Sequence, residues 1–157
     1  MAGFFAWLSR SLDPGHDIDE LARRLDIDVA RVASQRLAYR TFRIPKRSGG
    51  WRQIEAPEGD LKHVQRKILQ RVLTGLKTHP CAIGFERGKS IVTHAREHTG
   101  QGVVIRLDLV AFFPSTREDR VYDYFRFIGW NRKSSRLLTK LTTHQKSLPQ
   151  GAPTSPR

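Results

Sequence analysis

The amino-acid sequence predicts an α+β fold for its 157 residues. Three observations support this prediction: amphipathic helical patterns near both ends, one β-hairpin pattern, and one short apolar run rich in β-branched residues. The expected order of elements is helix, hairpin, helix, strand, helix, helix. Apolar residues make up 38% of the chain, which is ordinary for a globular protein and argues against global disorder.

The first 38 residues are expected to form a helical N-terminal extension. Residues 4–8 (FFAWL) are too short to span a bilayer and predict a short packing helix. Residues 17–37 have a helical pattern that Asp17 or Asp19 can cap. Its apolar positions recur at three- and four-residue spacing: Ile18, Leu21, Leu25, Val29 and Val32.

The same region superficially resembles a helix-turn-helix, which would make the protein a DNA-binding regulator. Residues 1–39 hold five Arg or Lys against six Asp or Glu, so they offer no excess positive charge to DNA. A two-helix packing element is therefore the preferred interpretation.

The middle of the chain predicts a hairpin followed by a helix. Residues 39–44 alternate like a strand, residues 48–50 (SGG) form a turn, and residues 51–54 resume as a second strand with a basic tip between them. From Leu61 to Leu76 the apolar residues follow one helical face, and Gly75 and Pro80 mark the end of the helix.

The C-terminal third predicts one strand and two helices. Gly102 to Leu109 is a short apolar, β-branched run typical of a buried central strand. Ser115 with Glu118 matches a capping box for a helix that reaches about Ile128 and stops at Gly129. Residues 134–141 predict another short helix.

The charge of the chain indicates a polyanionic partner. The formal net charge is +13, and all of the excess lies in residues 40–157, which hold 23 Arg or Lys against nine Asp or Glu. Such a surface favours the binding of nucleic acid. The alternative is a basic surface that is merely solvated and binds no nucleic acid. Cys81 is the only cysteine, which excludes an intrachain disulfide and suits a reducing cytosol. No segment predicts membrane insertion.

Asp108 is the most informative single residue. An isolated carboxylate inside an apolar strand is costly unless it is paired or bound to a metal ion. Mg²⁺ accepts carboxylate oxygens and substrate phosphates together. The alternative is an ion pair with a residue such as Arg106, although neighbours on a strand face opposite ways. From this residue alone both interpretations stay open.

Four ordered blocks resemble retron-type reverse transcriptases and together span residues 39–156. Residues 44–54 (IPKRSGGWRQI) with 56–57 (AP) resemble the fingers hairpin, and residues 84–91 (GFERGKSI) resemble the second block. Residues 107–115 (LDLVAFFPS) resemble the first palm motif, and residues 148–156 (LPQGAPTSP) the fourth block. Residues 94–98 (HAREH) lie where these enzymes usually have Asn-Ala-x-x-His, and the first position departs. The resemblance implies an incomplete right-hand polymerase fold over residues 39–157, containing the fingers and the start of the palm.

The resemblance also implies a role for individual residues. Asp108 would hold two catalytic Mg²⁺ ions, and Leu109 would offer its backbone carbonyl to the second ion. Phe113 would be the steric gate that rejects ribonucleotides. Nucleotide contacts would come from Lys46 and Arg52 at the triphosphate and from Gln150 and Gly151 beside the nucleotide and the template base. Nucleic-acid backbone contacts would come from Arg47, Arg66, Arg71, Arg87 and Lys89.

The sequence contains no Asp-Asp dipeptide, whereas the family carries paired aspartates in a Tyr-x-Asp-Asp hairpin after the fourth block. The expectation is therefore an N-terminal portion that does not polymerise alone and is completed by further residues or a second polypeptide. A non-catalytic RNA-binding module is the alternative. The implied partners are an RNA template or noncoding RNA, an RNA–DNA hybrid and deoxynucleoside triphosphates. The resemblance places such an enzyme in the bacterial cytoplasm, where relatives serve in phage defence.

Overall fold

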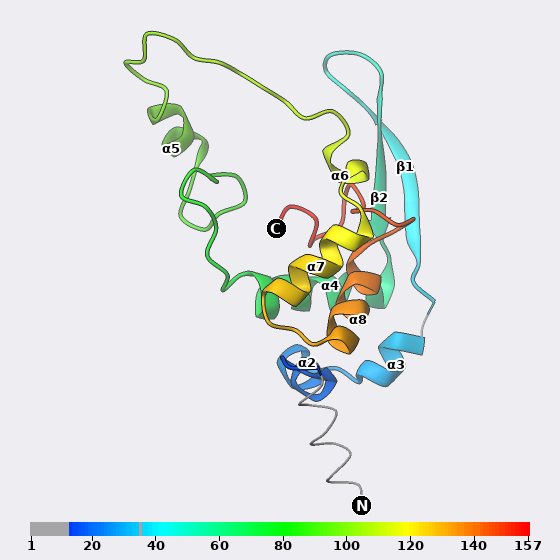
Figure 1. Cartoon of the computed structure of the whole chain (residues 1–157). Coiled ribbons are helices and arrows are strands. Elements are labelled where there is room, and N and C mark those ends of the chain that lie inside the picture. The colour runs from blue at the N-terminus through cyan, green and yellow to red at the C-terminus, as the bar shows by residue number, and fades with distance from the viewer. Residues whose placement is uncertain (1–12, 35) are drawn as a thin grey trace, which may run out of the picture.

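The computed structural model describes residues 13–34 and 36–157, so the helix expected at residues 4–8 lies outside the described residues. Helices pack at the base of a two-stranded hairpin, and a long arm, residues 77–111, leaves this body and returns to it (Figure 1). In chain order the elements are α2 (Ile18–Leu25), α3 (Val29–Ser34), β1 (Tyr39–Pro45), β2 (Trp51–Pro57), α4 (Gly59–Ile68), η1 (Leu69–Leu73), α5 (Ile91–Arg96), α6 (Phe112–Ser115), α7 (Glu118–Phe127) and α8 (Arg132–Thr142). No helix in these described ranges is both long and apolar enough to cross a bilayer.

The N-terminal helical pattern forms two helices. The carboxylate of Asp17 caps α2 by accepting a hydrogen bond from the Glu20 amide at 2.9 Å. The helix ends at Asp26, whose φ of +50° is left-handed, and α3 follows. Leu21 and Leu25 are fully buried in the core. The two-helix packing interpretation is therefore confirmed, with the break between the helices at Asp26.

The hairpin is confirmed and extends further than its pattern predicts. β1 and β2 pair antiparallel from Tyr39 opposite Pro57 to Pro45 opposite Trp51. In the turn, the Lys46 amide donates to the Gly50 carbonyl at 3.0 Å. Gly49 and Gly50 both have positive φ, of +86° and +78°, which glycine adopts without strain.

The core lies where α4 and η1 meet the two C-terminal helices and α2. The predicted apolar face of the helix is confirmed, since Leu61, Val64, Ile68 and Val72 are buried. Its last turn widens to a π-helix, and the Thr74 amide bonds the Leu69 carbonyl at 2.8 Å. Residues from the other elements complete this core: Leu21, Leu25, Phe125, Trp130, Leu138 and Leu141.

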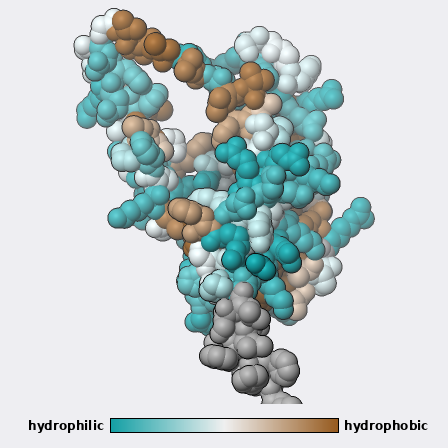
Figure 2. Space-filling view, in the orientation of Figure 1, coloured by the Kyte–Doolittle hydropathy of each residue, from teal (hydrophilic) through white to brown (hydrophobic). Residues whose placement is uncertain are grey.

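The predicted buried strand over residues 102–109 is wrong. These residues lie in the returning part of the arm without strand structure, and Val103, Ile105 and Leu107 are 78–89% exposed. Figure 2 shows the resulting apolar surface along the arm. A central strand needs hydrogen-bonding neighbours on both sides, and the described residues hold one sheet of only two strands, β1 and β2.

The predicted capping box is also wrong. The Ser115 hydroxyl donates to the Phe112 carbonyl at 2.9 Å and so closes the short helix α6. Glu118 begins the next helix, α7, whose N-cap Arg117 makes no side-chain cap. The predicted stop at Gly129 is confirmed, with φ of +97°. The last predicted helix is confirmed as α8, which is capped by the Asn131 side chain.

Candidate nucleotide and nucleic-acid site

The hairpin carries exposed cations toward its tip. Lys46 and Arg47 lie in the turn and Arg52 lies near the start of β2, and all three side chains are exposed. Within the part of the chain that the structure describes, none of the three joins an ion pair. Free, solvated cations at a projecting turn are available to a phosphate.

The loop over residues 148–156 docks against β2. The Glu55 amide donates to the Gln150 carbonyl at 2.8 Å, which ties the loop to the strand. Gly151 has a φ of +127°, and a Cβ atom at this position would lie 2.7 Å from Cγ2 of Ile54. Only glycine allows so close an approach. Because alternate residues of a strand share a face, Arg52 lies on the same face of β2 as Ile54.

A hydrogen bond within the docked loop and the burial of its residues fix the conformation of the loop. The Ser155 hydroxyl donates to the Pro149 carbonyl at 2.7 Å, and Ala152, Thr154 and Ser155 are buried. Gln150 and Gly151 are therefore held beside the hairpin face that carries Arg52. The structure brings together three of the predicted nucleotide-contacting residues from two separate sequence blocks.

Asp108 is not part of the assembly formed by the hairpin and the docked loop. It is exposed on the arm with Leu109, so the costly burial that the sequence predicts for its carboxylate does not occur. The alternative ion pair with Arg106 is not formed either. In residues 13–34 and 36–157, no group of three or more His, Cys, Asp or Glu could hold a metal ion. One exposed carboxylate does not by itself make a two-ion site.

The two phenylalanines after Asp108 begin α6. Their rings meet edge to face, with centroids 5.5 Å apart and planes at 74°. Phe113 is partly buried, whereas Phe112 is 48% exposed. The Phe112 ring lines a cavity of about 240 Å³ between α7 and residues 148–157. Ala111, which precedes the pair, has a left-handed φ of +53°, which marks local backbone strain.

The cations predicted to contact nucleic-acid backbones lie on four different parts of the structure. Arg66 is exposed on α4, and Arg87 and Lys89 are exposed on the arm. Arg71 is used within the fold, since its guanidinium donates to the Arg24 carbonyl at the end of α2 at 3.0 Å. Figure 1 shows α4 at the base of the hairpin, away from the turn that carries Arg47. These residues do not form one patch.

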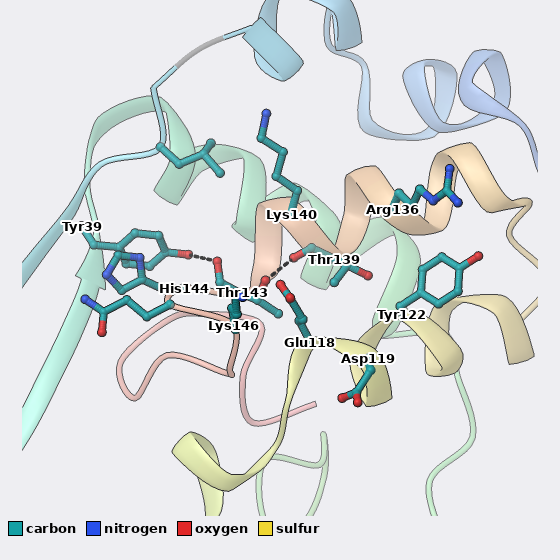
Figure 3. Close-up of a pocket in the computed structure, with 12 residues that line it drawn as sticks. Tyr39, Glu118, Asp119, Tyr122, Arg136, Thr139, Lys140, Thr143, His144 and Lys146 are labelled. Carbon is teal, nitrogen blue, oxygen red and sulfur yellow. Dashed lines mark hydrogen bonds between the residues drawn. The ribbon is translucent and has the colours of Figure 1, made fainter.

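A second cavity, which the sequence did not reveal, opens between α8 and the start of α7 (Figure 3). Its volume is about 640 Å³. Tyr39 stacks on His144 with ring centroids 4.2 Å apart, and the buried Gln65 amide donates to the Tyr39 hydroxyl at 2.9 Å. Burial raises the pKa of Tyr39 to about 12, so this hydroxyl stays protonated and serves the packing.

The rim of this second cavity has mixed charge. Glu118 and Asp119 come from α7, and Arg136, Lys140 and Lys146 come from α8 and the following turn (Figure 3). Two carboxylates beside three cations give little preference for a phosphate. This cavity is therefore not the candidate nucleotide site, although it is more spacious than the one beside Phe112.

Comparison with known proteins gives one family. The profile described as "Reverse transcriptase (RNA-dependent DNA polymerase)" matches residues 44–157. Retron Ec86 reverse transcriptase of Escherichia coli is 34% identical over 146 residues, which cover 90% of this chain and 45% of the relative. Retron Mx162 reverse transcriptase of Myxococcus xanthus is 39% identical over 136 residues, which cover 75% of this chain and 28% of the relative. The chain thus spans less than half the length of these relatives.

Proposed function

Because this chain belongs to the reverse transcriptase family, with retron enzymes among its relatives, we propose that it forms the nucleotide-facing part of an RNA-directed DNA polymerase. The observation that carries the proposal is the docking of the Gln150 loop on β2. It joins the fingers-like hairpin to the fourth block and sets Gly151 beside the face that carries Arg52. The proposed substrates are an RNA template and deoxynucleoside triphosphates.

In this proposal the hairpin binds the triphosphate. Arg52 offers a bidentate fork to phosphate oxygens, and Lys46 offers a mobile point charge from the turn. Gly151 lets the loop lie directly against the strand that carries Arg52, because a side chain there would meet Ile54. The absence of competing carboxylate partners for Lys46 and Arg52 in the described residues supports this assignment.

Asp108 is proposed as one carboxylate ligand of a two-Mg²⁺ centre. We propose that further carboxylates, on the same or a second polypeptide, complete this centre, since these 157 residues contain no Asp-Asp pair. With Asp108 as one ligand, such a centre would supply activation of the attacking hydroxyl and charge neutralisation of the triphosphate.

Primer extension tests the proposal. The 157 residues alone and a fusion protein, in which the remainder of the Escherichia coli Ec86 relative follows residue 157, are each given RNA template, primer, deoxynucleotides and Mg²⁺. We expect DNA product from the fusion protein and none from the 157 residues. If the fusion protein folds, binds RNA and makes no DNA, the alternative of a non-catalytic RNA-binding module stands instead.

The alternative of a DNA-binding regulator has less support. Glu20 pairs with both Arg23 and Arg24 on α2, and the Arg24 guanidinium also lies 5.2 Å from the Trp130 ring centroid. The cations of this helix are thus engaged within the fold. If nucleic-acid binding survives deletion of residues 1–38, the regulator hypothesis fails.

Lys46→Ala and Arg52→Ala in the fusion protein are each expected to raise the apparent KM for deoxynucleotides about tenfold, because a hydrogen bond to a charged group contributes about 1.5–3 kcal/mol. Steady-state kinetics with varied deoxynucleotide concentration measures the change. Arg43→Ala is the matched control, since Arg43 is exposed on the opposite face of the same hairpin, across from Gln53. An unchanged KM in both variants would assign these cations to the template.

Phe113→Ala in the fusion protein is expected to increase ribonucleotide incorporation at least about tenfold, because removing a ring removes the steric rejection of a 2′-hydroxyl. Competition between ribo- and deoxynucleotides at one template position measures the ratio. Phe112→Ala is the control, since its half-exposed ring lines the neighbouring cavity. Equal discrimination in wild type and Phe113→Ala would exclude Phe113 as the gate.

A further inference from the structure

We infer that His94 and His98 form a two-histidine chelating site for a divalent transition metal ion such as Zn²⁺. The two imidazoles are one helical turn apart in sequence, at the end of α5 and in the turn that follows. Their Nε2 atoms face each other at 3.3 Å, and their rings lie nearly perpendicular, at 85°. Both side chains are exposed, so an ion can reach them from solvent.

The distance between the two nitrogens matches chelation. Zinc binds histidine nitrogen at about 2.0–2.1 Å in tetrahedral geometry, which places two such nitrogens roughly 3.3–3.4 Å apart. The two side chains therefore need little movement to bind one ion. The same spacing allows a hydrogen bond between one protonated and one unprotonated nitrogen. Because that bond is exposed, water competes with it, and a metal ion can take its place once the proton of the donor ring resides on Nδ1 instead of Nε2.

The chemistry of the pair selects the class of ion. Imidazole nitrogens suit Zn²⁺, Ni²⁺ and Cu²⁺, whereas Mg²⁺ prefers oxygen ligands. The site is thus separate in position and in chemistry from the proposed Mg²⁺ ligand Asp108. No third His, Cys, Asp or Glu joins the pair within the described ranges, so water would fill the remaining coordination positions. The expected affinity is below that of a structural zinc site with four protein ligands.

Chelation would stabilise the short helix α5. The helix has six residues and buries none of them, and helices this short are marginal in water. Its N-terminus is held by the Ser90 hydroxyl, which accepts from the Thr93 amide at 3.2 Å. An ion that bridges His94 and His98 would hold its C-terminal turn in the same way. The metal would therefore order the arm a few residues before the apolar run that carries Asp108.

A titration of the tag-free 157-residue chain with ZnCl₂, followed by NMR of the histidine ring protons, tests the inference. We expect the signals of His94 and His98 to shift together and to saturate at one ion per chain. The other four histidines, His16, His63, His79 and His144, should show no shift at that stoichiometry. Hydrogen exchange of the amides of residues 94–98 should slow when Zn²⁺ is added.

His94→Asn and His98→Asn should each weaken Zn²⁺ binding by about 100-fold or more, because losing even a supporting contact of a metal ligand costs 10- to 100-fold. His63→Asn, an exposed histidine on α4, is the control and should bind as the wild type does. Unchanged Zn²⁺ binding in both variants, or a first equivalent that shifts a different histidine, would overturn the inference. Circular dichroism melts verify that each variant folds. The result is independent of polymerase activity, so it neither supports nor weakens the proposed function.

Discussion

The substitution Asp108→Asn in the fusion protein is expected to lower the rate of DNA synthesis about 10³-fold or more, since loss of a metal ligand removes several kcal/mol of transition-state stabilisation. Asn keeps the shape of the side chain and removes its charge. Primer extension under single-turnover conditions measures the rate of the chemical step. Because Asp108 is exposed and makes no ion pair in the described residues, the variant should fold as the wild type does.

Asp119→Asn and Asp123→Asn are the matched controls for this prediction. Both carboxylates are exposed on α7 and follow Asp108 closely in sequence, and Asp119 lies 3.7 Å from the Arg117 guanidinium. Each should retain wild-type activity within about threefold. Comparable losses at Asp119 and Asp108 would indicate a general effect of removing negative charge. Full activity of Asp108→Asn would remove Asp108 from the catalytic centre.

The substitution Gly151→Ala is expected to destabilise the 157-residue chain by about 2–6 kcal/mol. Two effects contribute: about 1–3 kcal/mol from a non-glycine residue at a φ of +127°, and about 1–3 kcal/mol from the contact of the new Cβ with Ile54. Urea unfolding measures the change in the free energy of unfolding. In the fusion protein the same variant should also raise the KM for deoxynucleotides, because the loop can no longer lie against β2.

Two other glycines separate the contributions to this loss. Gly49 has a φ of +86° with open space around it, so Gly49→Ala reports the backbone strain without the contact. Gly75 has neither a positive φ nor a close neighbour, so Gly75→Ala should be nearly neutral. We expect the order of destabilisation to be Gly151, then Gly49, then Gly75. If Gly151→Ala and Gly49→Ala are equally destabilised, the loop does not dock closely on β2.

The features that the sequence predicted correctly depend on local interactions. The hairpin follows from alternation around a glycine turn, and α4 follows from an apolar face whose members are three or four residues apart. The stop at Gly129 follows from its own backbone freedom. The ordered blocks that resemble reverse transcriptases are likewise a property of the linear sequence, and the family match over residues 44–157 confirms them.

The features that the sequence did not determine depend on remote partners. The run around Asp108 has the composition of a strand, yet a strand exists only where other strands satisfy its amides and carbonyls. Ser115 ends the short helix α6, and Glu118 begins the separate helix α7, so the two residues do not form one capping box. The contact of Gly151 with Ile54 joins residues almost 100 positions apart, so only the packed chain brings the loop to the hairpin. Local patterns specify elements because their energies come from neighbouring residues, whereas the site forms through contacts that exist only after the chain has folded.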